Sequence, residues 1–85
     1  MRLGGRLAGA IEVLADIEAR RRPATDALKD WGLSHRFAGS KDRAFVAGLV
    51  LDTLRKRRSM AYRMGEDSVR AAVLGTLRYS WDWPA

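Results

Sequence analysis

The stretch "SKDRAFVAGLVLDTLRKRRSMAYRM", residues 40–64, decides the fold of this chain. Its apolar residues recur at steps of three and four, which predicts one long helix over 41–64. The main apolar face holds Phe45, Val46, Leu49, Val50, Leu54, Met60, Ala61 and Met64. A second, thinner stripe on the opposite side holds Ala44, Gly48, Leu51 and Tyr62. Because apolar residues occupy two sides, we expect this helix to be packed on both. Ser40 is the expected N-cap, with Asp42 in the first turn.

The basic run "RKRR" at 55–58 has two interpretations. It could clamp a polyanion, or it could only solvate a helix end. Arg57 is the unusual member, because at 100° per residue it falls on the same side as Val46 and Val50. Three interpretations stay open for it. Its stem lies along the core with the charged head in water, or the helix loosens before residue 57, or this side faces a phosphate.

The rest of the chain predicts further helices and no strands. An apolar stripe with helical spacing covers 3–20, and Arg20, Arg21 and Arg22 follow where cations suit a helix C-terminus. A second helix is expected over 24–31, either reaching 37 or ending at Gly32 with a short piece after it. A fourth helix, capped by Asp67 or Ser68, is expected to reach about residue 80. The prediction is a single all-α domain over 1–85, a small bundle of four to five helices with a long central third helix.

Composition favours an anionic partner. Lysine and arginine number 16 against 10 acidic residues, giving a net charge of +6, and Lys29, Lys41 and Lys56 are the only lysines. Arginine binds phosphate through two parallel hydrogen bonds, which favours nucleic acid, although a GC-rich genome also raises arginine content. No apolar run approaches the roughly 20 residues that cross a bilayer. We therefore expect no membrane partner. The chain has no cysteine, so we also expect a cytoplasmic protein without disulfides or thiolate metal sites.

The residue pattern argues against catalysis. His35 is the only histidine and has no second ligand at metal-binding spacing, so we expect a surface or half-buried residue. The glycines of "GGRLAG", 4–9, do not match a phosphate-binding loop. The serines lack a base partner, and the carboxylates are spread along helices. We therefore predict no catalytic, metal-binding or cofactor-binding residue in this chain.

Residues 40–64 resemble the central segment of the NusB-like N-terminal domain of the Sun/RsmB family, bacterial 16S ribosomal RNA (cytosine-C5) methyltransferases. The shared pattern is an Asp-Arg pair, here Asp42-Arg43, then an apolar helix and Leu54-Arg55 followed by more basic residues. The segment "RLAGAIEVLADI", 6–17, is similar to the opening helix of the family, and 68–79 resembles its next helix. The family domain continues with further helices, so the resemblance implies a shortened domain or the N-terminal part of a longer protein.

The resemblance implies a domain that positions ribosomal RNA, of the 16S class, for an attached catalytic domain. S-adenosylmethionine and a nucleophilic cysteine would belong to that absent domain, so this chain alone would not be an enzyme. The RNA-binding candidates are Arg2, Arg6, Arg55, Lys56, Arg57, Arg58 and Arg63. We expect Arg43 to be structural and to pair with a carboxylate near Asp42.

Two other functions stay open. In the first, the chain is a helical protein–protein or dimerisation module of the NusB type, self-associating through exposed Leu51, Tyr62, Trp81 and Trp83. In the second, it is a DNA-binding helical domain. The second is disfavoured because no helix–turn–helix spacing is evident and the basic run sits at a helix end.

Overall fold

The computed structural model describes residues 2–82 and is all-helical over that range, which confirms the predicted class. Four α-helices are followed directly by a short π-helix: α1 (Leu3–Arg20), α2 (Ala24–Ser34), α3 (Ser40–Met64), α4 (Val69–Gly75) and η1 (Thr76–Ser80). No strand occurs between residues 2 and 82. Trp83, one of the residues proposed for self-association, lies outside the described residues.

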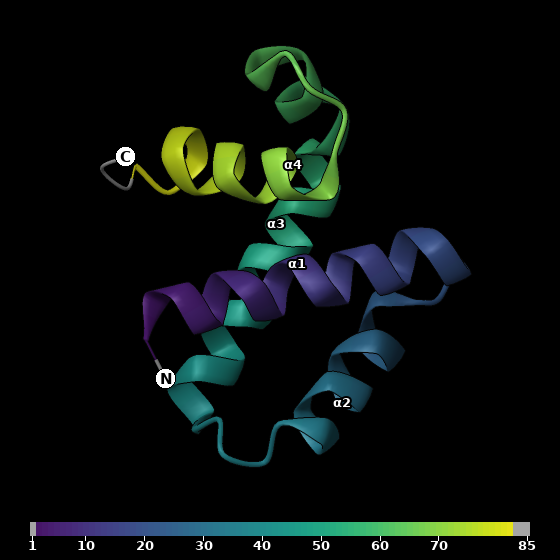
Figure 1. Cartoon of the computed structure of the whole chain (residues 1–85), viewed down its shortest axis with the longest axis vertical. Helices are drawn as coiled ribbons and strands as arrows, with labels where there is room; N and C mark the ends of the chain where they lie inside the picture. The colour runs from purple at the N-terminus through teal and green to yellow at the C-terminus, as the bar shows by residue number, and fades with distance from the viewer. Residues whose placement is uncertain (1, 83–85) are drawn as a thin grey trace.

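The helices form two layers. Figure 1 shows α1 and α4 running side by side across α3, while α2 lies beside the first half of α3. The Cα atoms span 34 × 29 × 15 Å. Two helices packed with axes 8–10 Å apart, each with a Cα radius near 2.3 Å, fill about 13–15 Å. The thin dimension therefore holds two helices and no third, so α3 is covered by α1 and α4 on one side only.

Local sequence signals explain most helix ends. Arg21 adopts a left-handed conformation, φ 53°, and ends α1, and Pro23 precedes α2. The Ser68 hydroxyl accepts a hydrogen bond from the Ala71 backbone N–H at 3.1 Å, so Ser68 is the predicted cap of α4. The prediction that Ser40 caps α3 is wrong.

The cap of α3 is Gly39, one residue earlier than predicted. The Asp42 carboxylate accepts from the Gly39 backbone N–H at 3.2 Å. This bond occupies the Gly39 N–H, which would otherwise lack a helical partner. The helix therefore starts at Ser40, and the Ser40 hydroxyl does not cap it. Asp42 is buried and also accepts from the Arg6 Nε at 2.6 Å, which ties the start of α1 to the start of α3.

The core lies where α1 and α4 cross α3. Its fully buried large side chains include Leu14 of α1, Val46, Leu49 and Val50 of α3, and Val73 of α4. These residues belong to the predicted apolar faces, and their burial explains why the helices cross at this level. Trp31 of α2 closes the core against α1, where its indole lies directly on Gly9.

The prediction that α3 is packed on two sides holds only in part. Gly48 of the thinner stripe is covered by Trp81, whose ring carbon would lie 3.5 Å from a Cβ at that position. Leu51 and Tyr62 of the same stripe are 46% and 91% exposed. Nothing between residues 2 and 82 covers this part of α3. The described helices include none long and apolar enough to cross a membrane.

The chain after η1 returns to α3 through Trp81. Its ring meets Phe45 edge-on at 5.2 Å, and its Nε1 donates to the Asp52 carboxylate at 2.7 Å. This hydrogen bond lowers the pKa of Asp52 below its ordinary 3.8, and a hydrogen bond from Arg55 lowers it further, against partial burial, which raises it. Asp52 is thus held ionised where η1 docks on α3.

The Asp52 contact predicts acid lability. Because the folded-state pKa lies below 3.8, the contribution to stability is fully present above that pH and is lost as pH falls through the folded-state value. We expect Asp52→Asn to lower the free energy of unfolding by about 1 kcal/mol at neutral pH. The gap from wild type should narrow as the pH falls below 3.8 and through the lower folded-state pKa of Asp52. Urea unfolding of both proteins at neutral pH and across an acid series measures it, and a gap that does not change with pH would contradict the prediction.

Candidate nucleic-acid interface

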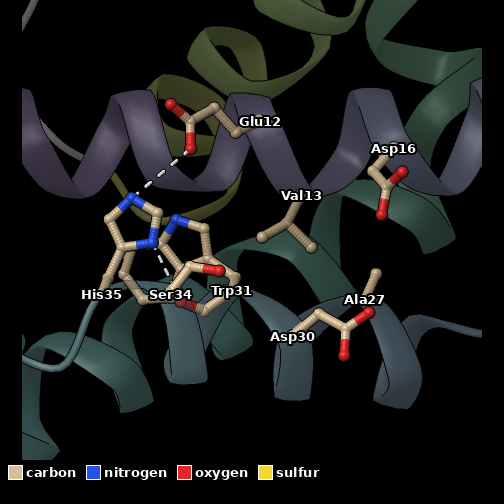
Figure 2. A pocket seen from close by; sticks show the side chains of 8 residues that line it. All are labelled: Glu12, Val13, Asp16, Ala27, Asp30, Trp31, Ser34 and His35. Atoms are coloured by element: carbon tan, nitrogen blue, oxygen red, sulfur yellow. Dashed lines mark hydrogen bonds and ion pairs between the residues drawn. The ribbon is translucent and has the colours of Figure 1, made fainter.

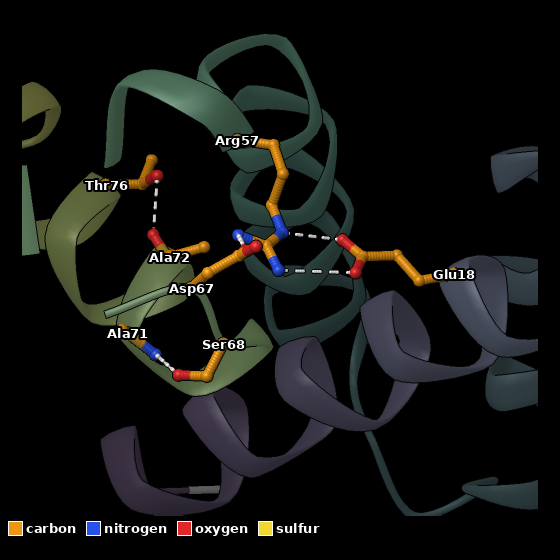
Figure 3. A network of polar contacts seen from close by, with 7 residues as sticks. All are labelled: Glu18, Arg57, Asp67, Ser68, Ala71, Ala72 and Thr76. Atoms are coloured by element: carbon orange, nitrogen blue, oxygen red, sulfur yellow. Dashed lines mark hydrogen bonds and ion pairs between the residues drawn. The ribbon is translucent and has the colours of Figure 1, made fainter. Parts of the chain in front are cut away.

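Arg57 joins three parts of the fold and does not face outward (Figure 3). Its guanidinium donates two hydrogen bonds to the Glu18 carboxylate of α1, at 2.7 and 3.3 Å. A third nitrogen lies 2.9 Å from the Asp67 carboxylate, in the turn before α4. The Glu18 bond raises the pKa of Arg57 above its ordinary value. Since α3 continues through residue 57, the loosened-helix interpretation is wrong, and the two carboxylates leave the phosphate interpretation without support.

The two N-terminal candidates lie away from the basic run. Arg2 is exposed at the N-cap of α1. Arg6 is half-buried, bonded to Asp42, with its guanidinium 5.0 Å from the Phe45 ring centroid. Along α3, Asp42 and Lys56 are separated by about 21 Å at 1.5 Å per residue. Arg6 is therefore a packing and capping contact at the opposite end of α3 from 55–58, and the two predicted clusters do not converge.

The other cations in the second half of α3 lie on the side away from Arg57. Arg55, Ser59 and Arg63 form a row with i, i+4 spacing, and half-buried Lys56 lies three residues before Ser59 and two turns before Arg63. Arg58 and Tyr62 extend the same face on the other side of Arg55. Arg55, Arg58 and Arg63 are all exposed, and Arg55 is also paired with Asp52. Four of the seven sequence candidates thus form a continuous basic surface over two turns.

A groove of about 430 Å³ opens at the edge of that surface, and we call it the basic groove. Its lining residues are Lys56, Ser59, Met60 and Arg63 from α3 with Tyr79 and Ser80 from η1. No carboxylate of the described residues, 2–82, lines it. The Lys56 Nζ donates to the Ser80 Oγ, which fixes the ammonium at the groove wall.

Two guanidinium groups lie close to an aromatic ring at this groove. Tyr79 is 46% exposed, with the Arg63 Cζ 5.0 Å and the Arg78 Cζ 5.6 Å from its ring centroid. Such contacts orient guanidinium groups while leaving their N–H donors available. The combination offers charged donors for phosphate and a partly exposed aromatic edge beside them.

Sequence reasoning missed Arg78, Tyr79 and Ser80. The apolar spacing of 69–81 placed Leu77 and Trp81 inward, so it left 78–80 on the outer side of the fourth helix. Nothing in the sequence places that side next to Lys56 and Arg63, because the contact depends on how η1 crosses α3. A basic–aromatic–hydroxyl triplet at a helix end was the available signal.

A second cavity, between α1 and α2, is less suited to a ligand (Figure 2). Its volume is about 220 Å³, and Glu12, Asp16, Asp30 and His35 line it with Trp31. Asp16 and Asp30 are both bonded to Arg22, whose pKa the Asp30 bond raises. These two carboxylates are therefore already paired within the chain.

His35 in this cavity has a structural setting. Its ring stacks on Trp31 at 4.6 Å, its Nδ1 lies 2.9 Å from the Trp31 carbonyl oxygen, and its Nε2 lies 3.8 Å from Glu12. No group of three or more potential metal ligands occurs among residues 2–82. His35 is half-buried and holds the end of α2 against α1.

Comparison with known proteins found no relative of this chain. No family model, curated protein or solved structure matches this chain. What the chain binds is therefore inferred from the residue chemistry of the basic groove and from the resemblance of 40–64.

Proposed function

We propose that this chain is a non-catalytic RNA-binding domain, and the observation that carries the proposal is the basic groove. Lys56 and Arg63 of α3 line it with Tyr79, Arg78 of η1 lies against the Tyr79 ring, and no carboxylate of residues 2–82 lines the groove. Cations without carboxylate partners attract phosphates, and contacts of this kind fix the position of a nucleic acid without reading its sequence.

The exposed ring favours RNA with unpaired bases over duplex DNA. Unpaired bases can stack on an aromatic side chain, which a base inside a duplex cannot do. The groove is formed where α3 meets η1, and its cations are not arranged along the outer side of a single helix, as they are when a helix lies in a major groove. Phosphate contacts with Lys56 and Arg63, beside a base packed against the exposed part of Tyr79 or on its guanidinium neighbours, suit a single-stranded or looped segment.

The finer assignment is a NusB-like domain that positions 16S ribosomal RNA for an attached S-adenosylmethionine-dependent cytosine-C5 methyltransferase domain. It is supported by the resemblance of 40–64, where Arg55, Lys56 and Arg58 continue the family pattern. The chain holds no cysteine to attack the cytosine ring, so in this proposal its part is binding, and the chemistry belongs to the attached domain.

The second candidate is a helical interaction or dimerisation module. It is supported by the exposure of Leu51 and Tyr62 on the uncovered side of α3. Trp81 does not contribute to it, because its ring is packed on Phe45 and Gly48 and its Nε1 is bonded to Asp52. The expectation that Trp81 is exposed for self-association is therefore wrong.

A salt titration tests the proposal. We expect the chain to bind a looped 16S ribosomal RNA fragment more tightly than duplex DNA of equal length, with affinity falling steeply as salt rises. About three to four phosphate contacts would give a slope of log K against log salt near −2 to −3, at about 0.7 per contact on single strands. Salt-insensitive binding, or equal binding of both nucleic acids, would contradict it, and a dimer without RNA binding would favour the second candidate.

A further inference from the structure

A separate groove lies between α2 and α3, on the opposite end of α3 from the basic groove. It has a volume of about 430 Å³. Its apolar wall consists of Leu28, Gly32 and Leu33 of α2 with Ala47 of α3, and its cations are Lys29 and Arg43. We call it the α2–α3 groove.

Arg43 spans this groove and is not paired as the sequence predicted. Its Nη2 donates to the Gly32 carbonyl oxygen of α2 at 3.3 Å, and it has no carboxylate partner among residues 2–82. The guanidinium is exposed, so the contact to a carbonyl leaves its positive charge unneutralised. Lys29 is exposed as well, and no carboxylate lines the groove.

The groove continues along the uncovered side of α3. Ala47 and Leu51 are four residues apart on one stripe, between Arg43 one turn before them and Arg58 two turns after. Leu33 is 58% exposed and Leu51 is 46% exposed. Since the bundle has only two layers, this stripe has apolar side chains in its middle and cations at both ends without a helix over it.

The apolar residues of this surface suit a helix. Ala47 presents only a methyl group, so a third helix could approach α3 closely beside Arg43, with its own apolar residues against Leu33 and Leu51. Peptides recognised in this way place apolar anchors at i, i+3, i+4 and i+7 along one face.

The charges select the partner. Lys29, Arg43 and Arg58 would be favourable to glutamates or aspartates on the flanks of a docked helix. A second copy of this chain is a poor occupant, because each copy carries a net charge of +6. We infer that the α2–α3 groove is a docking site for an acidic amphipathic helix of a partner protein.

Two dye-labelled peptides of about 20 residues test the inference with the full chain. Both carry leucine at i, i+3, i+4 and i+7, and the remaining face holds glutamate in one and lysine in the other. We expect the glutamate peptide to bind at least about tenfold more tightly, measured by fluorescence polarisation. Equal binding of both peptides, or binding of neither below millimolar concentration, would overturn the inference.

Variants locate the site. Ala47→Glu adds bulk and negative charge inside the groove, and we expect it to weaken the glutamate peptide about tenfold or more. Ala8→Glu is the matched control, because Ala8 is an exposed alanine of α1 in the other layer, and it should bind as wild type. Both substitutions are on solvent-accessible helix faces, and circular dichroism checks that both proteins fold. Equal affinities for the two variants would place the peptide elsewhere and overturn the inference.

Two further measurements distinguish the α2–α3 groove from the basic groove and from a dimer interface. Replacing Lys56, Arg63 and Arg78 by alanine should leave peptide affinity within about fivefold, the loss from long-range attraction alone, so that loss of RNA binding and loss of peptide binding are distinguishable. Sedimentation measures self-association. A dimer that Ala47→Glu dissociates would assign the groove to a second copy and overturn the inference, whereas a monomer supports it.

Discussion

Replacing Lys56, Arg63 and Arg78 together by alanine is expected to weaken RNA binding about a hundredfold while the domain stays folded. Each substitution removes one charged donor, Lys56 and Arg63 from the lining of the basic groove and Arg78 from beside its Tyr79 ring, each worth about 1 kcal/mol for an accessible contact. Three such losses amount to about 3 kcal/mol, or roughly two decades in affinity. The salt slope should become shallower by about 2, since each lost phosphate contact accounts for about 0.7. Filter binding or polarisation across a salt series measures both quantities.

The matched control removes the same charge elsewhere. Lys29, Arg36 and Lys41 are exposed cations outside the basic groove, and changing all three to alanine also lowers the net charge from +6 to +3. If the groove is the binding site, this variant should lose less than about fivefold in affinity, from long-range attraction alone. Equal losses for the two triple variants would mean that RNA senses only the overall charge, and the groove assignment would be wrong.

Arg57 belongs to the same basic run, but we expect its replacement to lower stability and not RNA affinity. Arg57→Ala should leave RNA affinity within about threefold of wild type, because its guanidinium is engaged by Glu18 and Asp67. It should instead lower the free energy of unfolding by about 1 kcal/mol, a modest value because both carboxylates are partly exposed. An affinity loss as large as that of the groove variant would return Arg57 to the interface.

The four side chains of the run at 55–58 thus point to two different sides of α3. Arg55, Lys56 and Arg58 point outward and Arg57 points toward α1, as its position at 100° per residue indicated. Sequence periodicity was sufficient to identify the odd member, because an α-helix fixes which side a residue lies on. It was not sufficient to choose among the three interpretations, since the choice depends on Glu18 of another helix, 39 residues away.

The same limit applies to the other elements predicted from the sequence. Helix 3–20 and the end of the third helix at Gly65 were predictable, because apolar spacing and a glycine with φ 67° are local features. The Gly39 cap was missed because the Gly39 backbone N–H donates to the Asp42 carboxylate, and α3 begins one residue earlier than a Ser40 cap would allow. Tyr79 was missed because its neighbours Arg63 and Lys56 come from a crossing between η1 and α3, which no local pattern specifies.

Gly9→Val is expected to destabilise the domain by about 3 kcal/mol, the largest effect we expect from a single substitution. A Cβ at Gly9 would lie 2.6 Å from a ring carbon of Trp31, well inside the distance that side chains tolerate. Moving the indole away would disrupt its stacking on His35 at 4.6 Å and its buried packing against α1. A domain of this size has a total stability of roughly 4–13 kcal/mol, so the loss is a large fraction of it.

Gly4 is the matched control on the same helix, since a Cβ there would meet no atom within 4 Å. Gly4→Val should change the free energy of unfolding by less than about 0.5 kcal/mol. The alanine pair sharpens the contrast: Gly4→Ala should stabilise by up to about 1 kcal/mol through helix propensity, and Gly9→Ala should destabilise despite the same gain. Urea unfolding followed by circular dichroism measures all four variants. Equal effects at the two glycines would mean that α1 and Trp31 do not pack closely, and that α2 docks on α1 in some other way.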